Sequence, residues 1–437
     1  MRAYLLRRLL LIPVTLLGVT LIVFALTRIL PGGPYEQALQ RAAAGEGARS
    51  RLSSGSGGSS LTPDQKEQLR MQFSMNDHFL TGYLKWLGLL PREVNARFVP
   101  LGEDNATPMV LLGDTDPDGR AFSKKVLILD FADPSRPPRL ELPPPASGPP
   151  SGWSARFGLD EKTGPDGRTA FVPDPSRIVA FRQKRSGLLQ GDFQESLSSG
   201  EPVASLISRR LPVSLFYGLL TTLLTYLIAI PLGVVKAIRH RTFLDNASSV
   251  ALFIGYAIPG FALGTLLLLW FSFRFDWFPM SGFTSADFAS LSLPGKIRDL
   301  LHHAALPLVC YMIGSWTLYA FLMKNSLMDV LATDYVRTAV SKGVSFPQAV
   351  TRHALRNAII PIASTFGQNV SLILSGSVLI ENVFDIPGIG QLGFESALHR
   401  DYTTMMALIT LSSALLMLGN LISDLLIAAL NPRIRFD

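Results

Sequence analysis

The sequence predicts an all-α polytopic membrane protein with six transmembrane helices and a large, partly β, extracytoplasmic insert between the first two. Two features of the 437-residue chain indicate a membrane. Hydrophobic residues make up 48% of it and charged residues only 17%, against roughly 25% charged residues in soluble domains. The apolar residues are also concentrated in six stretches without Asp, Glu, Lys or Arg: residues 9–27, 211–235, 246–273, 300–323, 357–380 and 402–423.

Each stretch is long enough, or nearly so, to cross a bilayer. A helix rises about 1.5 Å per residue and the hydrocarbon core is roughly 30 Å thick, so about 20 residues are needed. Buried helices of a soluble protein are the alternative, but six such stretches in one chain favour a membrane. The first stretch could be a signal peptide. Its apolar run exceeds the roughly 7–15 residues typical of one, so we expect a retained helix.

The charges of the connecting loops predict that both termini are cytoplasmic. In that orientation the inner pieces hold 13 Lys or Arg in 64 residues: 1–8, 236–249, 324–357 and 430–437. The short outer loops, 272–303 and 382–403, hold 4 in 54 residues. Cytoplasmic loops are enriched in Lys and Arg, which gives this orientation.

Three regions follow from this topology. Residues 1–30 are the N-terminal end and the first helix, residues 31–206 are extracytoplasmic, and residues 207–437 hold helices two to six with a cytoplasmic loop at 324–357. Within the outer segment, the Ala, Gly and Ser of residues 41–60 predict a flexible linker. Thr62-Pro63-Asp64 is a helix start, so we expect helices over 63–73 and 78–90.

Residues 92–186 predict a small β-rich insert. Short apolar runs at 109–112, 126–129 and 177–181 are separated by turn sequences such as Asp116-Pro117-Asp118-Gly119. Asp114, Asp116 and Asp118 also match the first half of a calcium-binding EF-hand loop. Lys125 stands where that loop needs Glu, so a solvated β-turn is favoured over a calcium site.

Several kinds of chemistry are missing from the sequence. It has no phosphate-binding G-x-x-x-x-G-K-[ST] loop, no G-x-S-x-G and no H-E-x-x-H. Its single cysteine, Cys310, excludes an intramolecular disulfide framework. The net charge of +7 is thinly spread, which argues against nucleic-acid binding. We therefore expect no catalytic residue, no metal and no cofactor in this chain.

The inner loop carries the most informative local pattern. Residues 334–342 predict a short amphipathic helix, and Gly343 is placed to close it as a C-cap. Ser345 is placed to cap a second helix that has Pro347 in its first turn. A basic helix–Gly–helix on the inner face suits docking of another protein. The alternative is a helix lying on lipid headgroups.

These residues also carry a family resemblance. Arg337-Thr338-Ala339 and Gly343 resemble the EAA motif of binding-protein-dependent ABC importer permeases, in its dipeptide and oligopeptide form. Further similar strings are Arg210-Leu211-Pro212-x-Ser214, Glu381-x-Val383-Phe384-x-x-Pro387-Gly388-x-Gly390 and Asn431-Pro432-Arg433. The resemblance covers residues 1–90 and 187–437 and is greatest to Yej-type permeases, associated with microcin C and peptide uptake. Val340-Ser341 and Asn431 depart from the usual pattern.

The resemblance implies a type I importer fold in the bacterial cytoplasmic (inner) membrane, in contact with lipid. It implies three kinds of partner: a second homologous permease subunit, two cytoplasmic ATPase subunits and an extracytoplasmic peptide-binding protein. The second permease could be a distinct chain or a second copy, and the exact substrate stays open. ATP hydrolysis would belong to the partners. The implied coupling residues are Arg337, Thr338, Ala339, Gly343, Ser345 and Arg352.

The fifth stretch offers polar residues for a translocation path. Spacing by three and four places Gln368, Ser371 and Ser375 on one helix face, beside Asn369. Amides and hydroxyls replace the hydrogen bonds that a peptide backbone loses on leaving water. Hydrogen bonds between helices are an equally good explanation for these residues.

Two other functions compete with an ATP-driven permease. A stand-alone secondary transporter or channel would need an ion-coupling group inside the membrane, and the six stretches hold no charged residue. Glu381 and Asp424 fall at expected membrane edges. A sensor that signals through an outer β domain is the second alternative. Neighbouring genes for ATPases and a binding protein would favour the permease.

Overall fold

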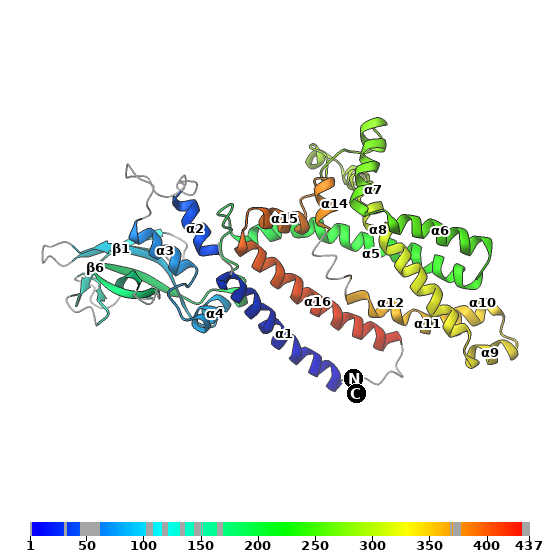
Figure 1. The fold of residues 1–437 in the computed structure, drawn as a ribbon, viewed down its shortest axis with the longest axis horizontal. Helices are drawn as coiled ribbons and strands as arrows, with labels where there is room; N and C mark the ends of the chain where they lie inside the picture. Colours follow the sequence, from blue (N-terminus) through cyan, green and yellow to red (C-terminus); the bar gives the residue numbers. More distant parts are fainter. Residues whose placement is uncertain are drawn as a thin grey trace. The chain divides into compact units, whose positions relative to one another are not determined.

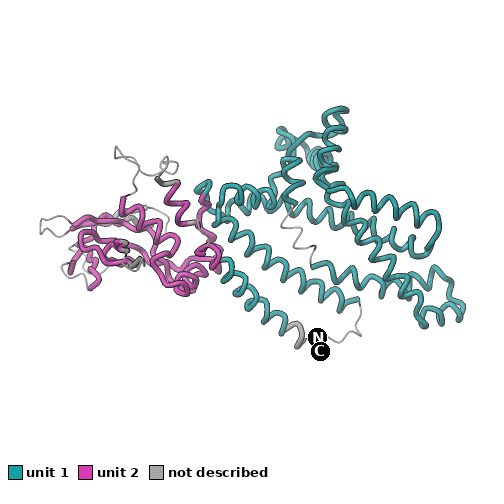
Figure 2. The backbone as a smooth tube through the Cα atoms, viewed as in Figure 1, with its two compact units in different colours: residues 1–23, 198–437 teal, residues 24–197 magenta. Residues whose placement is uncertain are grey.

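The computed structural model describes residues 2–29, 33–43, 62–101, 108–115, 121–131, 136–143, 150, 152–163, 169–367, 369 and 377–430. The chain forms two compact units, which Figure 2 shows in different colours. We call residues 1–23 with 198–437 the helical unit, and residues 24–197 the insert unit.

The helical unit consists of long apolar helices and short connecting ones (Figure 1). Four helices are long and apolar enough to cross a membrane: α1 (Arg2–Ile29), α5 (Val203–Ile238), α8 (Leu293–Leu331) and α16 (Tyr402–Leu430). They correspond to the first, second, fourth and sixth predicted spans. Arg8 on α1 pairs with Asp424 on α16, with Nε 3.3 Å from the carboxylate.

The third predicted span is a bent pair. Helix α6 (Phe243–Ala257) is followed by α7 (Gly260–Leu267) and the π-helical η2 (Leu268–Arg274), with a bend of 91° between α6 and the second part. The break falls at Ile258, which has extended backbone angles. Pro259 explains it, because a proline disfavours helical angles in the residue before it.

The fifth predicted span differs most from the expectation of one helix. It begins as α11 (Leu355–Ala358) and resumes after a turn as α12 (Ile360–Ser364). Pro361 occupies the first turn of α12, where its missing N–H costs nothing. Helix α14 (Val378–Val383) begins within the last three residues of the stretch, and Gln368 and residues 370–376 lie outside the described residues. Six spans thus remain a prediction, with four long helices and one bent pair described.

Helices α5 and α8 pack closely along their length. A Cβ atom on Gly233 of α5 would lie 2.6 Å from both the Ala320 carbonyl oxygen and the Met323 Cβ of α8. Such an approach requires glycine, because real Cβ atoms do not come so near. Short elements complete the helical unit: η3 (Phe288–Ser290), α9 (Asp334–Ser341), α10 (Phe346–Gln348), η4 (Ala349–Ala354) and α15 (Ile389–Leu398).

The insert unit contains two three-stranded antiparallel sheets, in the orders β1-β6-β5 and β2-β3-β4. Their strands are β1 (Arg92–Pro100), β2 (Met109–Thr115), β3 (Ala121–Leu129), β4 (Arg139–Glu141), β5 (Trp153–Thr163) and β6 (Thr169–Lys184). In β2, Val110 and Leu112 are buried while Met109 and Leu111 are exposed, the alternation of a strand with one face in a core. The aspartates of the candidate calcium loop at 116 and 118 lie outside the described residues.

Strand β6 is buried on both faces. Ile178 and Ala180 face a core shared by the two sheets, whereas Val179 packs with Met71 of α3 on the opposite side. Four short helices complete the unit: α2 (Pro34–Ala43), α3 (Pro63–Gln72), α4 (Phe79–Leu87) and η1 (Leu188–Gln190). The predicted start of α3 is confirmed by a capping box between Thr62 and Gln65. Helix α2 was not expected.

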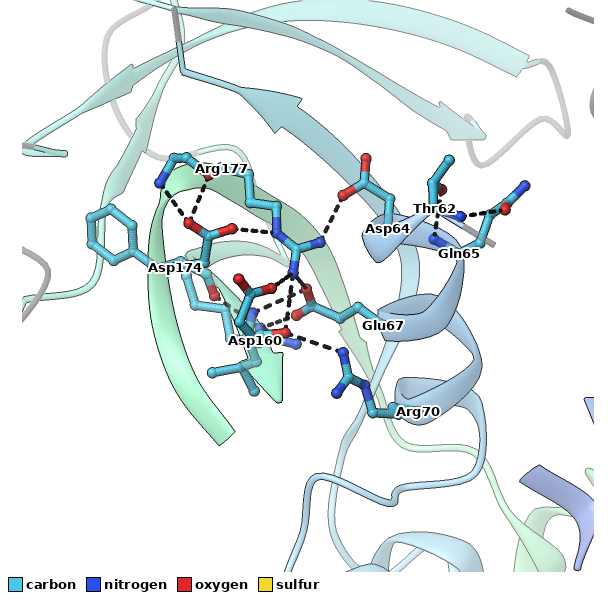
Figure 3. Close-up of polar contacts among 12 residues, drawn as sticks. Thr62, Asp64, Gln65, Glu67, Arg70, Asp160, Asp174 and Arg177 are labelled. Atoms are coloured by element: carbon cyan, nitrogen blue, oxygen red, sulfur yellow. Dashed lines mark hydrogen bonds and ion pairs between the residues drawn. The ribbon is translucent and has the colours of Figure 1, made fainter. Parts of the chain in front are cut away.

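An ion-pair cluster joins α3 to the β1-β6-β5 sheet (Figure 3). The Arg177 guanidinium of β6 lies 2.8 Å from Asp64, 2.7 Å from Asp160, 2.8 Å from Asp174 and 3.4 Å from the buried Glu67. Burial raises the pKa of Asp174, but hydrogen bonds from Ser176 and Arg177 outweigh it and hold that pKa below 3.8. The cluster therefore fixes α3 against the strands of the insert.

Replacing Arg177 with methionine is expected to destabilise the insert unit by about 2–3 kcal/mol, because hydrogen bonds to charged groups contribute roughly that much. Asp64, Asp160 and Asp174 would lose their bonds to the guanidinium, whereas Glu67 keeps Arg156 at 2.6 Å. Limited proteolysis of the purified full chain at neutral pH measures this as faster cleavage within residues 62–197. Lys162→Met is the control, since Lys162 on β5 is exposed. Equal cleavage rates in the two variants would contradict the role given to Arg177.

Candidate functional site

The helix expected at the start of the 324–357 loop is present as α9. Gly343 follows it with φ of +92°, a left-handed conformation that favours glycine. Its N–H donates to the Val340 carbonyl at 2.9 Å, and the Val344 N–H donates to Ala339 at 3.2 Å. This hydrogen-bond pair is typical of a glycine-terminated helix. No atom lies within 4 Å of an added Cβ, so the glycine is required by backbone conformation and not by packing.

The second half of the loop differs from the predicted helix. Ser345 is at the N-cap position of α10, but its side chain makes no capping hydrogen bond. Helix α10 has three residues and continues as the π-helical η4 and then α11. Pro347 stands in the first turn, as expected.

The predicted coupling residues lie together on this loop. Five are exposed and Ala339 is half-buried; Arg337, Thr338 and Ala339 lie on α9, Gly343 and Ser345 in the turn, and Arg352 in η4. On the covered side, Val336 of α9 packs with Ala349 and Val350 of η4 in a buried cluster. The same cluster contains Met323 and Leu327 of α8. The loop is thus a polar surface held directly on the end of α8.

A cavity of about 210 Å³ lies between α5, α8 and the segment around α14. Most of its lining residues are Ser, Thr or Tyr, and its bulkiest polar residues are Tyr217, Tyr226, Tyr311, Tyr319, Asn369 and Glu381. The Tyr319 hydroxyl donates to Asn369 at 2.8 Å, and the Asn369 amide donates to the Tyr226 hydroxyl at 2.6 Å. Asn369 is the only predicted path residue within the described part of the chain; Gln368, Ser371 and Ser375 lie outside it.

Helix α5 also contributes to this cavity, which was not predicted from the sequence. Ser214, Tyr217, Thr221 and Thr225 all line it. Their spacing of three and four residues places them on one helix face, a signal that was present in the sequence. Within the described residues the hydroxyls of Tyr217, Thr221 and Thr225 are buried without a hydrogen-bond partner.

The two strings of the family resemblance that begin at Arg210 and at Glu381 meet at one end of the cavity. Glu381 is 1% exposed, not at a solvated membrane edge. Its carboxylate accepts the Gln391 N–H at 2.7 Å, in the first turn of α15, where a negative charge is favoured. Gly388 leaves room for it, because a Cβ there would lie 2.5 Å from that carboxylate. The Ser214 hydroxyl of α5 accepts the Ile389 N–H at 2.8 Å.

Arg210 completes the junction between α5 and α15. Its guanidinium donates to the Gln391 side chain at 2.9 Å and to Glu395 at 3.0 Å. Asp401, the residue before α16, accepts hydrogen bonds from the N–H and hydroxyl of Thr404 at 3.2 and 2.8 Å. Arg210, Glu381 and Asp401 therefore stabilise the ends of helices α15 and α16. Among the described residues no group of three or more His, Cys, Asp or Glu could hold a metal ion.

Comparison with known proteins places these features in a family. Residues 229–436 match the family described as "Binding-protein-dependent transport system inner membrane component". The oligopeptide transport system permease protein AppB of Bacillus subtilis (strain 168) is 35% identical over 284 residues, which cover 64% of this chain and 88% of AppB. The chain belongs to this family of binding-protein-dependent permeases.

Other members of the permease family have a similar sequence identity to this chain. The inner membrane ABC transporter permease protein YejB of Escherichia coli O157:H7 is 39% identical over 249 residues, covering 56% of this chain and 68% of that protein. The peptidoglycan transport system permease protein YejB of Agrobacterium fabrum (strain C58 / ATCC 33970) is 34% identical over 284 residues, covering 64% and 78%. The resemblance seen in the sequence motifs is confirmed. This permease is a membrane protein with several apolar helices.

Proposed function

We propose that this permease moves peptides or peptide-like compounds into the cell, driven by ATP hydrolysis in partner subunits. The substrate class follows from relatives named for oligopeptide and peptidoglycan transport. A cavity lined by hydroxyls, amides and tyrosines supports it, because these groups can exchange hydrogen bonds with a peptide backbone. Asn369 would contact the substrate, and the path would continue along Gln368, Ser371 and Ser375.

The observation that carries the proposal is the exposed 324–357 loop. Its polar residues are free for a partner, while its buried side packs on α8, which also lines the cavity. A displacement of this surface by a partner would therefore be transmitted to the cavity through one continuous helix, α8. In the proposed assembly two ATPases dock on the loop through Arg337, Thr338, Ala339, Gly343, Ser345 and Arg352.

The remaining partners and the orientation follow from the same proposal. A second permease subunit, homologous or identical, would complete the pore, and a binding protein would deliver peptide from outside. Both termini and the 324–357 loop would face the cytoplasm, in agreement with the basic inner loops. The insert unit would lie on the side from which the binding protein approaches.

The test is uptake of a radiolabelled tripeptide by proteoliposomes containing this chain, its partner permease, both ATPases and the binding protein. We expect uptake that requires ATP and stops when the ATPases carry a Walker A lysine substitution. Uptake by this chain alone, driven by an ion gradient, would instead identify a secondary transporter. ATP-dependent uptake of other solutes, but of no peptide, would retain the importer and overturn its substrate class.

A further inference from the structure

Three charged residues from three helices form a buried cluster, which we call the lysine–aspartate clamp: Lys236 of α5, Asp245 of α6 and Lys324 of α8. The Lys324 ammonium lies 2.8 Å from both carboxylate oxygens of Asp245, and the Lys236 ammonium lies 3.1 Å from one of them. Lys236 also donates to the hydroxyls of Ser248 and Ser249 at 2.9 and 2.7 Å. The side chains of Lys236 and Asp245 are 0% and 3% exposed, and that of Lys324 is 10% exposed.

Stability alone does not account for this cluster. Two ammonium groups face one carboxylate, so the clamp holds an excess positive charge away from water. Both lysines also lie over the ring of Phe321, at 5.1 and 5.9 Å from its centre. Replacing buried ion pairs by packed apolar residues is often neutral or stabilising, and the best-attested role of such charges is to fix one arrangement of helices.

The clamp lies between the 324–357 loop and the cavity. Lys324 is flanked on α8 by Met323 and Leu327, which share a buried cluster with Val336 of α9. In the other direction along α8, Tyr319 lines the cavity and bonds Asn369. Five residues of helix, about 7.5 Å, separate Lys324 from Tyr319. A displacement of the loop that α8 carries toward the cavity therefore also moves the helix segment that holds Lys324.

The two lysines bind the same carboxylate but connect different parts of the chain. Lys236 and Asp245 are nine residues apart, on either side of the short α5–α6 turn, which links them covalently. Lys324 and Asp245 are 79 residues apart. The other contacts between α6 and α8 include a hydrogen bond, from the Thr317 hydroxyl to the Leu252 carbonyl at 2.8 Å, and the ring pair Phe253–Phe321 at 4.9 Å. Packed helices can slide past each other by small shear motions, whereas a bidentate ion pair fixes their register.

We propose that the Lys324–Asp245 pair is a positioning contact that couples α6 to α8 when ATPase partners displace the 324–357 loop. Lys236 is auxiliary and holds only the α5–α6 turn. This inference rests on the proposed ATP-driven function. It predicts that loss of Lys324 lets α8 move without α6, so that ATP is hydrolysed with less transport.

The experiment compares Lys324→Met with Lys236→Met in the reconstituted transporter. Each variant removes one positive charge and leaves one neutral Lys–Asp pair, so the two are matched in charge. The hydroxyls of Ser248 and Ser249 keep their bonds to α6 carbonyls when Lys236 is absent. The readouts are the membrane content of the chain, copurification of the ATPases, and tripeptide uptake per ATP hydrolysed. Lys324→Gln, which keeps a hydrogen-bond donor, is measured alongside.

We expect Lys324→Met and Lys324→Gln to lower uptake per ATP by about tenfold with the ATPases still bound, an effect typical of positions in a coupling network. Lys236→Met should stay within about twofold of wild type, because it leaves the Lys324–Asp245 pair between α6 and α8 in place. An unchanged ratio in both Lys324 variants overturns the proposal, as does an equal loss in Lys236→Met. Wild-type uptake tests the proposed function separately, because these outcomes concern only the ratio between variants.

Discussion

Replacing Gly343 with aspartate is expected to abolish ATP-coupled peptide uptake while the chain still assembles in the membrane. Gly343 has φ of +92° and ends α9 through the hydrogen bonds at Val340 and Ala339. An L-residue in this conformation costs roughly 1–2 kcal/mol, too little to unfold a domain. The Cβ of the new side chain meets no atom within 4 Å. The side chain therefore projects, with a negative charge, from the surface proposed to receive the ATPases.

The measurement is uptake in the reconstituted transporter, with the amount of chain in the membrane determined in parallel. Gly200→Asp is a matched control, because Gly200 also has positive φ (+72°) and open space around an added Cβ, and lies outside the 324–357 loop. We expect the control to transport at close to the wild-type rate. Normal uptake by Gly343→Asp would mean that the loop is not the coupling surface.

Local chemistry was sufficient to predict the elements that depend on neighbouring residues. The helix of residues 334–342 and its glycine end are properties of a few adjacent side chains, and the structure confirms both. The capping box of α3 is another such case. The fifth span is a counterexample, because an uncharged stretch predicts length and hydropathy but not the interruption at Pro361. In the insert, β1 and β5 were missed since their charged residues obscure the alternation that β2 shows.

The clamp could not be predicted from composition, although the positions of its three residues in the sequence share one feature. Lys236, Asp245 and Lys324 each adjoin the end of an uncharged stretch, on what the topology makes the same side of the membrane. Charges at such ends normally reach water and need no partner. Only the packing of α5, α6 and α8 reveals that these three are buried together. The same holds for Arg210 and Glu381, which lie far apart in the sequence but both contact α15.

Replacing Asp245 with asparagine is expected to cause the largest loss of stability in the helical unit, about 3–5 kcal/mol, because it leaves buried charges without a partner. Lys236 and Lys324 would then face each other with no carboxylate between them. The measurement is the thermal midpoint of the detergent-solubilised full chain and its abundance in the membrane. Asp329→Asn is the control on exposed surface of α8, with little expected change.

The double variant Asp245→Asn/Lys324→Met distinguishes charge imbalance from loss of packing. If the cost comes from two like charges held together, removing Lys324 as well should restore part of the stability, since Lys236 retains the Asp245 carbonyl and two serine hydroxyls as acceptors. If the cost came from lost volume or contacts, a second substitution would add to the damage. A double variant less stable than Asp245→Asn would therefore contradict the electrostatic account. Because the restored chain would still lack the α6–α8 ion pair, we expect it to hydrolyse ATP with poor uptake, separating what the clamp does for folding from what it does for transport.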